Sequence, residues 1–119
     1  MEAAPQVRHQ DDDVARFAEM LAAMGTEPRL RIVQLLLTAH PVGMVVGEIQ
    51  AETGIAPSTL SHHLEKLKSE NLVRVTREGT FLRYQAHAEV LEELLSFLYS
   101  ECCARTQTVR AENIVKLCR

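Results

Sequence analysis

The sequence predicts a mainly α-helical fold of the α+β class, with about five helices and one two-stranded β-hairpin. Its leucine-rich composition, with only five glycines, favours helices. Along most of the chain apolar residues recur at three- and four-residue steps, as in an amphipathic helix, whereas after Asn71 they alternate, as in a strand. One domain is the expected count for 119 residues. We expect it to span residues 12–104, between a disordered arm at 1–11 and a tail at 105–119.

The first two predicted helices have clear start and stop signals. The first spans residues 12–24, follows three aspartates that suit a helix N-terminus, and ends at Gly25. The second begins after Thr26, a capping residue that is followed by Glu27 and Pro28 in the first turn. It ends at His40–Pro41, because proline cannot continue a helix. Since it is apolar on nearly all sides, we expect it to be the buried central helix.

Two short helices joined by a tight turn follow. The first spans residues 45–52 and is closed by Gly54 as its C-cap. The second opens on Pro57–Ser58, runs to Asn71 and has leucines on one side. Two short helices with a glycine-containing turn between them are the helix-turn-helix signature.

A β-hairpin and a last helix complete the predicted fold. Residues 72–77 and 80–85 are strand-like, and Glu78–Gly79 is the predicted turn between them. A final long helix starts near His87–Ala88 and covers residues 90–101. A charged hairpin directly after a helix-turn-helix is a wing, so the predicted architecture is a winged helix-turn-helix.

This architecture predicts binding to double-stranded DNA, because the second helix of such a unit lies in the major groove. Residues 57–84 carry five basic and three acidic side chains, a local charge of +2, which leaves −5 for the rest of a chain with net charge −3. Serine and threonine are weak helix formers, so their frequency here indicates polar contacts. The predicted DNA contacts are Ser58, Thr59, Ser61, His62, His63 and Lys66 on the helix and Arg77 and Arg83 beside the hairpin tip.

The runs TEPRLRIVQLLL and GEIQAETGIAPSTLSHHLEKLKSENLVRVTREGTFLRYQA resemble the ArsR/SmtB family of bacterial metal-responsive repressors. The resemblance covers about residues 14–100. It implies a homodimer whose first and last helices pack together, and which leaves a pseudo-palindromic operator when an effector binds. The implied interface helices are Val14–Met24 and Val90–Glu101, with Phe17, Leu21, Leu91, Leu94 and Leu98 as contacts.

The effector site must come from the cysteines. The segment VVGEIQ lacks the Cys-x-Cys pair that some relatives use, and the last helix lacks the zinc-binding pattern of others. Cys102, Cys103 and Cys118 remain, and LYSECCART is similar to the C-terminal segment of arsenite-responsive members. Thiolates select soft ions, and trivalent arsenic or antimony forms three bonds, so three thiolates would complete the shell. The predicted effector is As(III) or Sb(III), and no organic cofactor is expected. The sulfurs of Cys102 and Cys103 converge on one ion only if the last helix ends near Glu101.

Several alternatives remain open at this point. Cys118 could be a bystander, and a two-thiolate site would then suit a monomethylated arsenical. The vicinal pair could instead be packed in the core, form a redox-sensing disulfide, or bind cadmium, lead or zinc. A winged helix can also bind protein rather than DNA. An enzyme is not expected, because no phosphate-binding glycine loop, nucleophile elbow or paired carboxylates occur.

The sequence also predicts the compartment. No run of 18 apolar residues occurs, so we expect no membrane span. The polar N-terminus lacks the apolar region of a signal peptide. We therefore expect a cytoplasmic protein with reduced cysteines.

Overall fold

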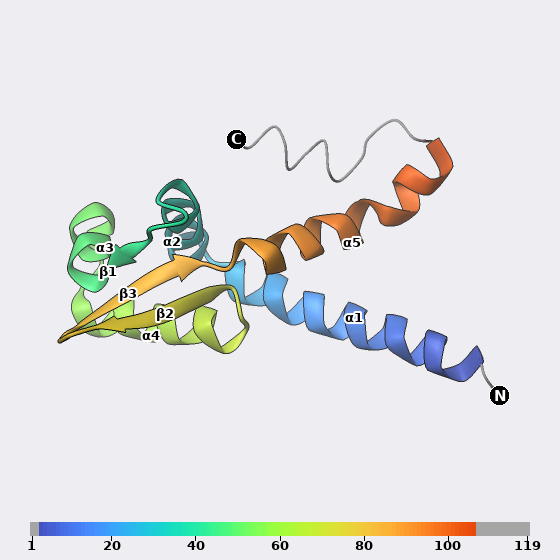
Figure 1. Cartoon of the computed structure of the whole chain (residues 1–119), viewed down its shortest axis with the longest axis horizontal. Coiled ribbons are helices and arrows are strands. Elements are labelled where there is room, and N and C mark those ends of the chain that lie inside the picture. Colours follow the sequence, from blue (N-terminus) through green and yellow to red (C-terminus); the bar gives the residue numbers. More distant parts are fainter. Residues whose placement is uncertain (1–2, 107–119) are drawn as a thin grey trace. The chain divides into compact units, whose positions relative to one another are not determined.

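The structure is a computed structural model that describes the backbone of residues 3–106 and the side chains of residues 12–100. Within that part of the chain five helices and three strands form the predicted winged helix-turn-helix (Figure 1). The helices are α1 (Ala3–Met24), α2 (Glu27–Thr38), α3 (Val46–Thr53), α4 (Pro57–Ser69) and α5 (Ala88–Thr106), and the strands are β1 (Met44–Val45), β2 (Val73–Glu78) and β3 (Phe81–Ala86). The chain divides after Ala86 into two compact units, the second of which contains α5.

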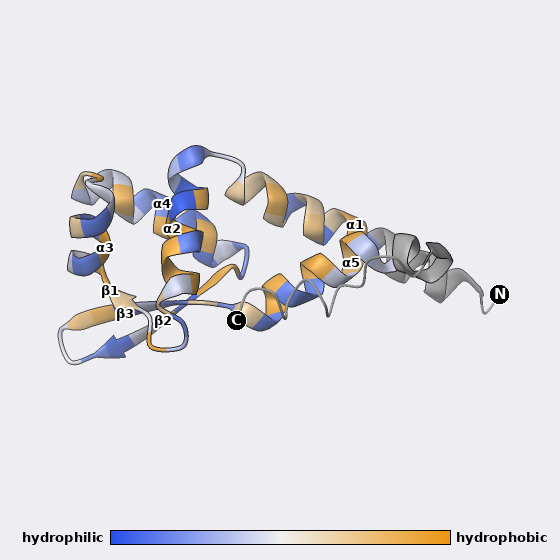
Figure 2. Ribbon diagram, turned by 90° about the horizontal axis from the view of Figure 1, so that it is seen from above, coloured by the Kyte–Doolittle hydropathy of each residue, from blue (hydrophilic) through white to orange (hydrophobic). Residues whose placement is uncertain are grey.

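The start of α2 and the end of α3 confirm the predicted caps. The Thr26 Oγ1 accepts a hydrogen bond from the Arg29 backbone N–H at 3.4 Å, which satisfies a donor that the first turn of α2 leaves unpaired. Gly54 closes α3 in the left-handed conformation, with φ of +72°. The helices alternate between apolar and polar residues along their length (Figure 2).

The core of the first unit is mostly aliphatic. The central helix α2 contributes its fully buried residues Ile32, Val33 and Leu36, as expected from its apolar sequence. Around it the other elements bury one side each, through Phe17, Met20 and Ala23 of α1, Ile49 of α3, Leu60, Leu64 and Leu67 of α4, and Leu72, Val73 and Ala86 of the hairpin region. Because these contacts come from five elements, they fix the position of α4 and of the wing in one unit.

The sheet is antiparallel with strand order β1-β3-β2. The wing turn lies at Gly79–Thr80, since Glu78 pairs with Phe81; the predicted turn was one residue too early. Gly79 has a φ of +62°, a conformation that a tight turn requires and that glycine adopts without strain. Strand β1 was not predicted, because two residues are too short to show alternation. It pairs Met44 with Tyr84 at the free edge of β3.

Two helix ends differ from the sequence prediction. Helix α1 begins at Ala3, so the arm predicted to be disordered over 1–11 is helical from that residue on. The residues there lack an apolar stripe, but alanine, glutamine and arginine have high helix propensity and continue the helix without one. Helix α5 extends to Thr106 instead of ending near Glu101, because no glycine or proline occurs within it to stop it. Residues 107–119 lie outside the part described.

Gly43 generates a stability prediction because β3 runs directly beside it. Its φ is +81°, and an added Cβ would collide with the Tyr84 backbone oxygen and lie 2.6 Å from the Gln85 Cγ. Gly54 has a similar φ of +72° but open space within 4 Å. We expect Gly54→Ala to cost about 1–2 kcal/mol, the strain of the left-handed conformation alone. Gly43→Ala should cost about 3 kcal/mol or more, because the β1–β3 pairing must also shift.

Urea unfolding of the two variants and the parent chain measures this difference directly. Equal losses at the two glycines would show that β1 does not hold Gly43 against β3.

Candidate nucleic-acid interface

Helix α4 exposes the polar side that the sequence predicts. Its leucines Leu60, Leu64 and Leu67 are at most 1% exposed and face the core. The opposite side is open to solvent, because residues three and four apart share one face of a helix. Five of the six predicted DNA contacts on the helix lie there: Ser58, Thr59, Ser61, His62 and Lys66.

His63 differs from its neighbour His62 in its surroundings. It follows Leu60 by three residues and precedes Leu67 by four, so it lies at the edge of the buried side and is half-buried. Its Nδ1 is 3.4 Å from the Nη1 of Arg29 on α2. Burial lowers the pKa of His63 below its usual value of 6.5, and the charges of Arg29 and His62 lower it further. The structure therefore places this histidine in a contact between helices rather than on the exposed side.

Glu65 also lies on the exposed side of α4, and it is not among the predicted DNA contacts. It is exposed one turn after Ser61, and its Oε1 lies 3.7 Å from the Lys68 Nζ. A carboxylate can accept a hydrogen bond from the cytosine N4 amino group, but it repels phosphate. Its spacing from Ser61 and His62 was the signal that could have revealed it.

Tyr84 on β3 has a raised pKa. Burial is the main cause, and the charge of Glu65 is the second.

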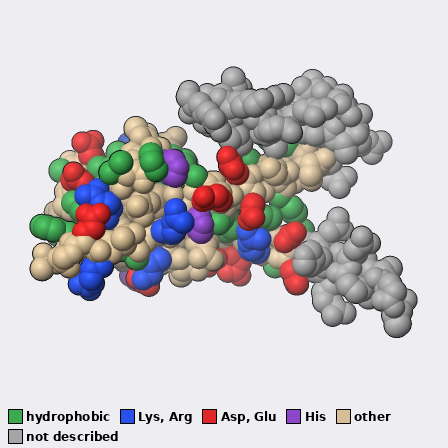
Figure 3. All heavy atoms as spheres, in the orientation of Figure 1, with side chains coloured by type: hydrophobic (Ala, Val, Ile, Leu, Met, Phe, Trp, Pro, Cys, Tyr) green, Lys and Arg blue, Asp and Glu red, His purple; other side chains and the backbone are tan. Residues whose placement is uncertain are grey.

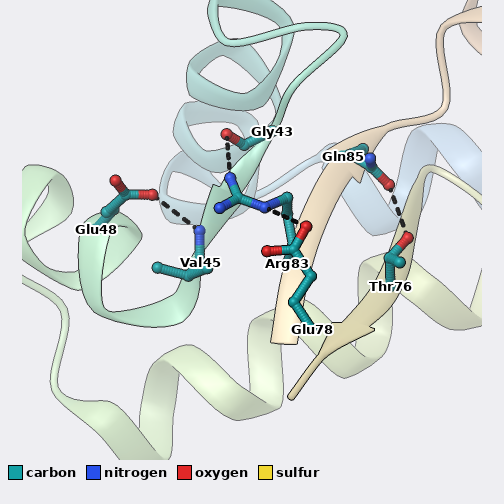
Figure 4. A network of polar contacts seen from close by, with 7 residues as sticks. All are labelled: Gly43, Val45, Glu48, Thr76, Glu78, Arg83 and Gln85. Atoms are coloured by element: carbon teal, nitrogen blue, oxygen red, sulfur yellow. Dashed lines mark hydrogen bonds and ion pairs between the residues drawn. The ribbon is translucent and has the colours of Figure 1, made fainter. Parts of the chain in front are cut away.

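The two predicted wing arginines have different environments. Arg77 is exposed near the end of β2, and Arg74, three residues before it and therefore on the opposite face of the strand, is exposed too. Arg83 lies on the central strand β3 and is held from both sides: its Nε donates to the Glu78 Oε2 at 2.9 Å, and its Nη1 donates to the Gly43 carbonyl at 3.3 Å (Figure 4). Its side chain is only 23% exposed. Arg83 thus joins the wing to the segment before β1, a role that the sequence could not show.

Two further hydrogen bonds support this end of the sheet. The Val45 backbone N–H donates to the Glu48 Oε1 at 3.0 Å, which ties β1 to the first turn of α3 (Figure 4). On the outer face of the wing, the Thr76 hydroxyl donates to the Gln85 side-chain oxygen at 3.2 Å. On the face of the molecule that Figure 3 shows, basic and acidic side chains are interspersed. Helix α4 exposes Lys66 and Lys68 beside Glu65, so the candidate interface is polar and only locally basic.

The residues expected at a dimer interface fall into two groups. Leu21 and Leu98 are 44% and 51% exposed, and Leu91 is half-buried. Phe17 and Leu94 are 5% and 4% exposed, so both are already buried in the single chain. Val14 of α1, which lies seven residues before Leu21 on the same side of the helix, is 54% exposed and was not selected.

The described side chains include no group of three or more histidine, cysteine or acidic residues that could hold a metal ion. Cys102 and Cys103 occupy adjacent positions within α5, but their side chains lie outside the described residues, as does all of Cys118. Adjacent positions on a helix point about 100° apart. Across residues 3–106 there is also no helix whose length and apolarity would let it cross a membrane.

Comparisons with known proteins agree with this geometry. The model of the arsR family of bacterial regulatory proteins matches residues 26–75, from the cap of α2 into β2. Nodulation protein NolR of Rhizobium meliloti is 29% identical over 98% of this chain and 91% of its own length. The putative arsenical resistance operon repressor ArsR2 of Halobacterium salinarum is 30% identical over 80% of this chain and 78% of its own length.

A solved structure shows the same arrangement of elements. The homodimeric winged helix-turn-helix DNA-binding domain of Mb0332 from Mycobacterium bovis, described as a possible ArsR-family regulator, superposes with a TM-score of 0.63. It is 29% identical to this chain, and the match covers 80% of this chain and 83% of that structure. These matches identify the fold, and the family model covers the helix-turn-helix up to the first residues of β2.

The environment of His63 predicts a pH dependence of stability. Because its pKa is lower in the folded protein, the unfolded chain binds the proton more readily, and the free energy of unfolding should fall as the pH drops below 6.5. This loss should level off below the folded-state pKa. His63→Asn should remove this part of the pH dependence, whereas His40→Asn, at an exposed position after α2, should retain it.

Urea unfolding at a series of pH values between about 5 and 7.5 tests this prediction, because that window spans ordinary histidine titration. Parallel curves for the parent chain and His63→Asn would contradict it.

Proposed function

We propose that this chain, which belongs to the arsR family of bacterial regulatory proteins, is a homodimeric repressor that trivalent arsenic or antimony releases from its operator. The observation that carries the DNA-binding part is the exposed polar side of α4 beside the wing. It presents hydroxyl, imidazole and ammonium groups on a helix whose other side is locked into the core. Such a helix can enter the major groove, where base edges accept and donate hydrogen bonds.

The exposed side chains are proposed to make two kinds of DNA contact, to phosphates and to base edges. Lys66 of α4 and Arg74 and Arg77 of β2 are exposed and can neutralise phosphates. Ser58, Ser61 and His62 are short or compact donors and acceptors that suit base edges. Arg83 supports the wing from within the sheet through Glu78 and Gly43.

The dimer is proposed from the exposed apolar residues and from the relatives. Val14 and Leu21 are exposed apolar residues on one side of α1, and Leu98 is an exposed apolar residue of α5. Exposed aliphatic residues at helical spacing favour burial against another helix. A second copy of the chain is the occupant proposed, in keeping with the homodimeric Mb0332 domain.

The effector is proposed from the cysteines and from the similarity to a putative arsenical resistance repressor. Cys102 and Cys103 are soft ligands at adjacent positions of α5, and Cys118 is the third thiol of the chain. Adjacent helical positions diverge, so binding through both sulfurs requires the last turn of α5 to open. A thiolate site would therefore couple metalloid binding to the conformation of the helix that carries the exposed Leu98.

The phosphate contacts generate a prediction about salt. Lys66→Ala should weaken binding to a fragment from the promoter of the chain's own gene, and should lower the salt slope by about one per subunit. The matched control is Arg31→Ala, which removes the same charge from an exposed residue of α2 that pairs with Glu27 at 2.6 Å. Fluorescence anisotropy at several salt concentrations measures both quantities. Equal salt slopes for the two variants would mean that α4 is not part of the DNA interface.

The cysteines generate a prediction about release. Arsenite should dissociate the reduced protein from the fragment, and Cys102→Ser and Cys103→Ser should each remain bound, because each variant lacks a thiolate that the site needs. Effector coupling in such repressors is typically about 1–3 kcal/mol, which corresponds to a 5- to 150-fold loss of DNA affinity. Cys118→Ser distinguishes a three-thiolate site from a two-thiolate site. It abolishes a three-thiolate site, whereas a two-thiolate site would still respond to methylarsenite.

The same titration distinguishes other effectors. Release by peroxide with no response to arsenite would replace this proposal with a redox switch, and release only by cadmium, lead or zinc would replace it with a divalent-metal sensor.

A further inference from the structure

Arg29 contacts three elements of the first unit. Its Nε donates a hydrogen bond to the carbonyl oxygen of Ala23 in the last turn of α1. Its Nη1 lies 3.4 Å from the Nδ1 of His63 on α4, and its backbone N–H donates to Thr26 at the cap of α2. A half-buried arginine in the first turn of α2 therefore connects the end of α1 to the side of α4.

The chemistry of the Arg29 and His63 side chains gives this connection a defined geometry. A guanidinium is a rigid planar fork, so its Nε and Nη1 hold the Ala23 carbonyl and the His63 ring at a fixed separation. For Nδ1 to accept from Arg29, the His63 ring must be neutral and carry its proton on Nε2. The lowered pKa of His63 favours that neutral form. The leucines of α4 hold the helix against the core, and the Arg29 fork adds a polar contact of one defined geometry between the end of α1 and α4.

We infer that Arg29 and His63 are positioning residues that transmit the location of the end of α1 to α4, and so set how α4 is presented to DNA. This inference rests on the proposed function, since it assigns α1 to the dimer and α4 to the major groove. His62, the adjacent residue on α4, is exposed and can contact DNA, whereas His63 acts through Arg29. A shift of α1 in the dimer then moves the exposed side of α4 through the guanidinium of Arg29.

Three substitutions separate positioning from charge and packing. Arg29→Lys keeps the positive charge but replaces the fork by a single ammonium, which cannot hold both partners in one geometry. His63→Gln is neutral and places its amide near the site of Nε2. His63→Asn is the matched rescue, because its amide oxygen lies near the position of Nδ1 and can accept from Arg29.

The first measurement is affinity for the promoter fragment at several salt concentrations. Arg29→Lys and His63→Gln should each lose about tenfold in affinity, on the scale of one side-chain hydrogen bond. Their salt slopes should match the parent, because no phosphate contact is lost. His63→Asn should recover most of the affinity that His63→Gln loses.

The second measurement does not depend on DNA or on arsenic, so it distinguishes failure of this inference from failure of the proposed function. Spin labels are attached to cysteines introduced at Glu19 of α1 and Ser61 of α4, both exposed, with the native cysteines replaced by serine. Labelled chains are diluted with unlabelled ones, so that the distance is measured within one subunit. Arg29→Lys and His63→Gln should broaden the α1–α4 distance distribution, and His63→Asn should restore the parent width.

Two outcomes would overturn the inference. One is a parent-like distance distribution in Arg29→Lys and His63→Gln. The other is equal broadening in all three variants together with a lower urea midpoint, because this result would mean that the pair only fills space.

Discussion

Burial of one side of α4 is the constraint on which the rest of the interface depends. Leu60, Leu64 and Leu67 are each held in the core, and they fix the rotation of the helix about its own axis. Once that rotation is set, every other position on the helix is assigned to solvent or to a neighbouring element. The hydroxyls of Ser58 and Ser61 are exposed for this reason, and His63 is turned toward Arg29 for the same reason.

The wing depends on a second, polar constraint. A hairpin that projects from a sheet has few apolar contacts at its tip, so polar contacts must hold it. Arg83 does this from the central strand, because Glu78 approaches it from the wing and the Gly43 carbonyl from the segment before β1. Gly43 can approach β3 only because it has no side chain. The position of the wing relative to α3 and α4 is thus decided by residues 40 positions apart in the chain.

The sequence predicts what local signals determine and misses what distant contacts determine. Thr26 and Gly54 were found because caps depend on neighbouring residues. The hydrogen bonds of Arg83 to Glu78 and Gly43 could not be predicted, because no local pattern shows that these residues surround it. The leucine spacing of α4 could have predicted that His63 is half-buried, because it places this residue at the edge of the buried side. The ends of α1 and α5 were misplaced because apolar periodicity ended before the helical backbone did.

The distribution of charge explains how a DNA-binding surface can occur on an acidic chain. Of the five basic side chains in residues 57–84, Lys68 and Arg83 are each engaged by a neighbouring carboxylate. Lys66, Arg74 and Arg77 are then the charges proposed to face phosphate, about six in a dimer, which corresponds to a salt slope near −5. Such a surface binds DNA by charge only modestly, so correct placement of both α4 helices must supply the remaining affinity. Loss of that placement would weaken binding, since a change of about 1–3 kcal/mol corresponds to a 5- to 150-fold change in affinity.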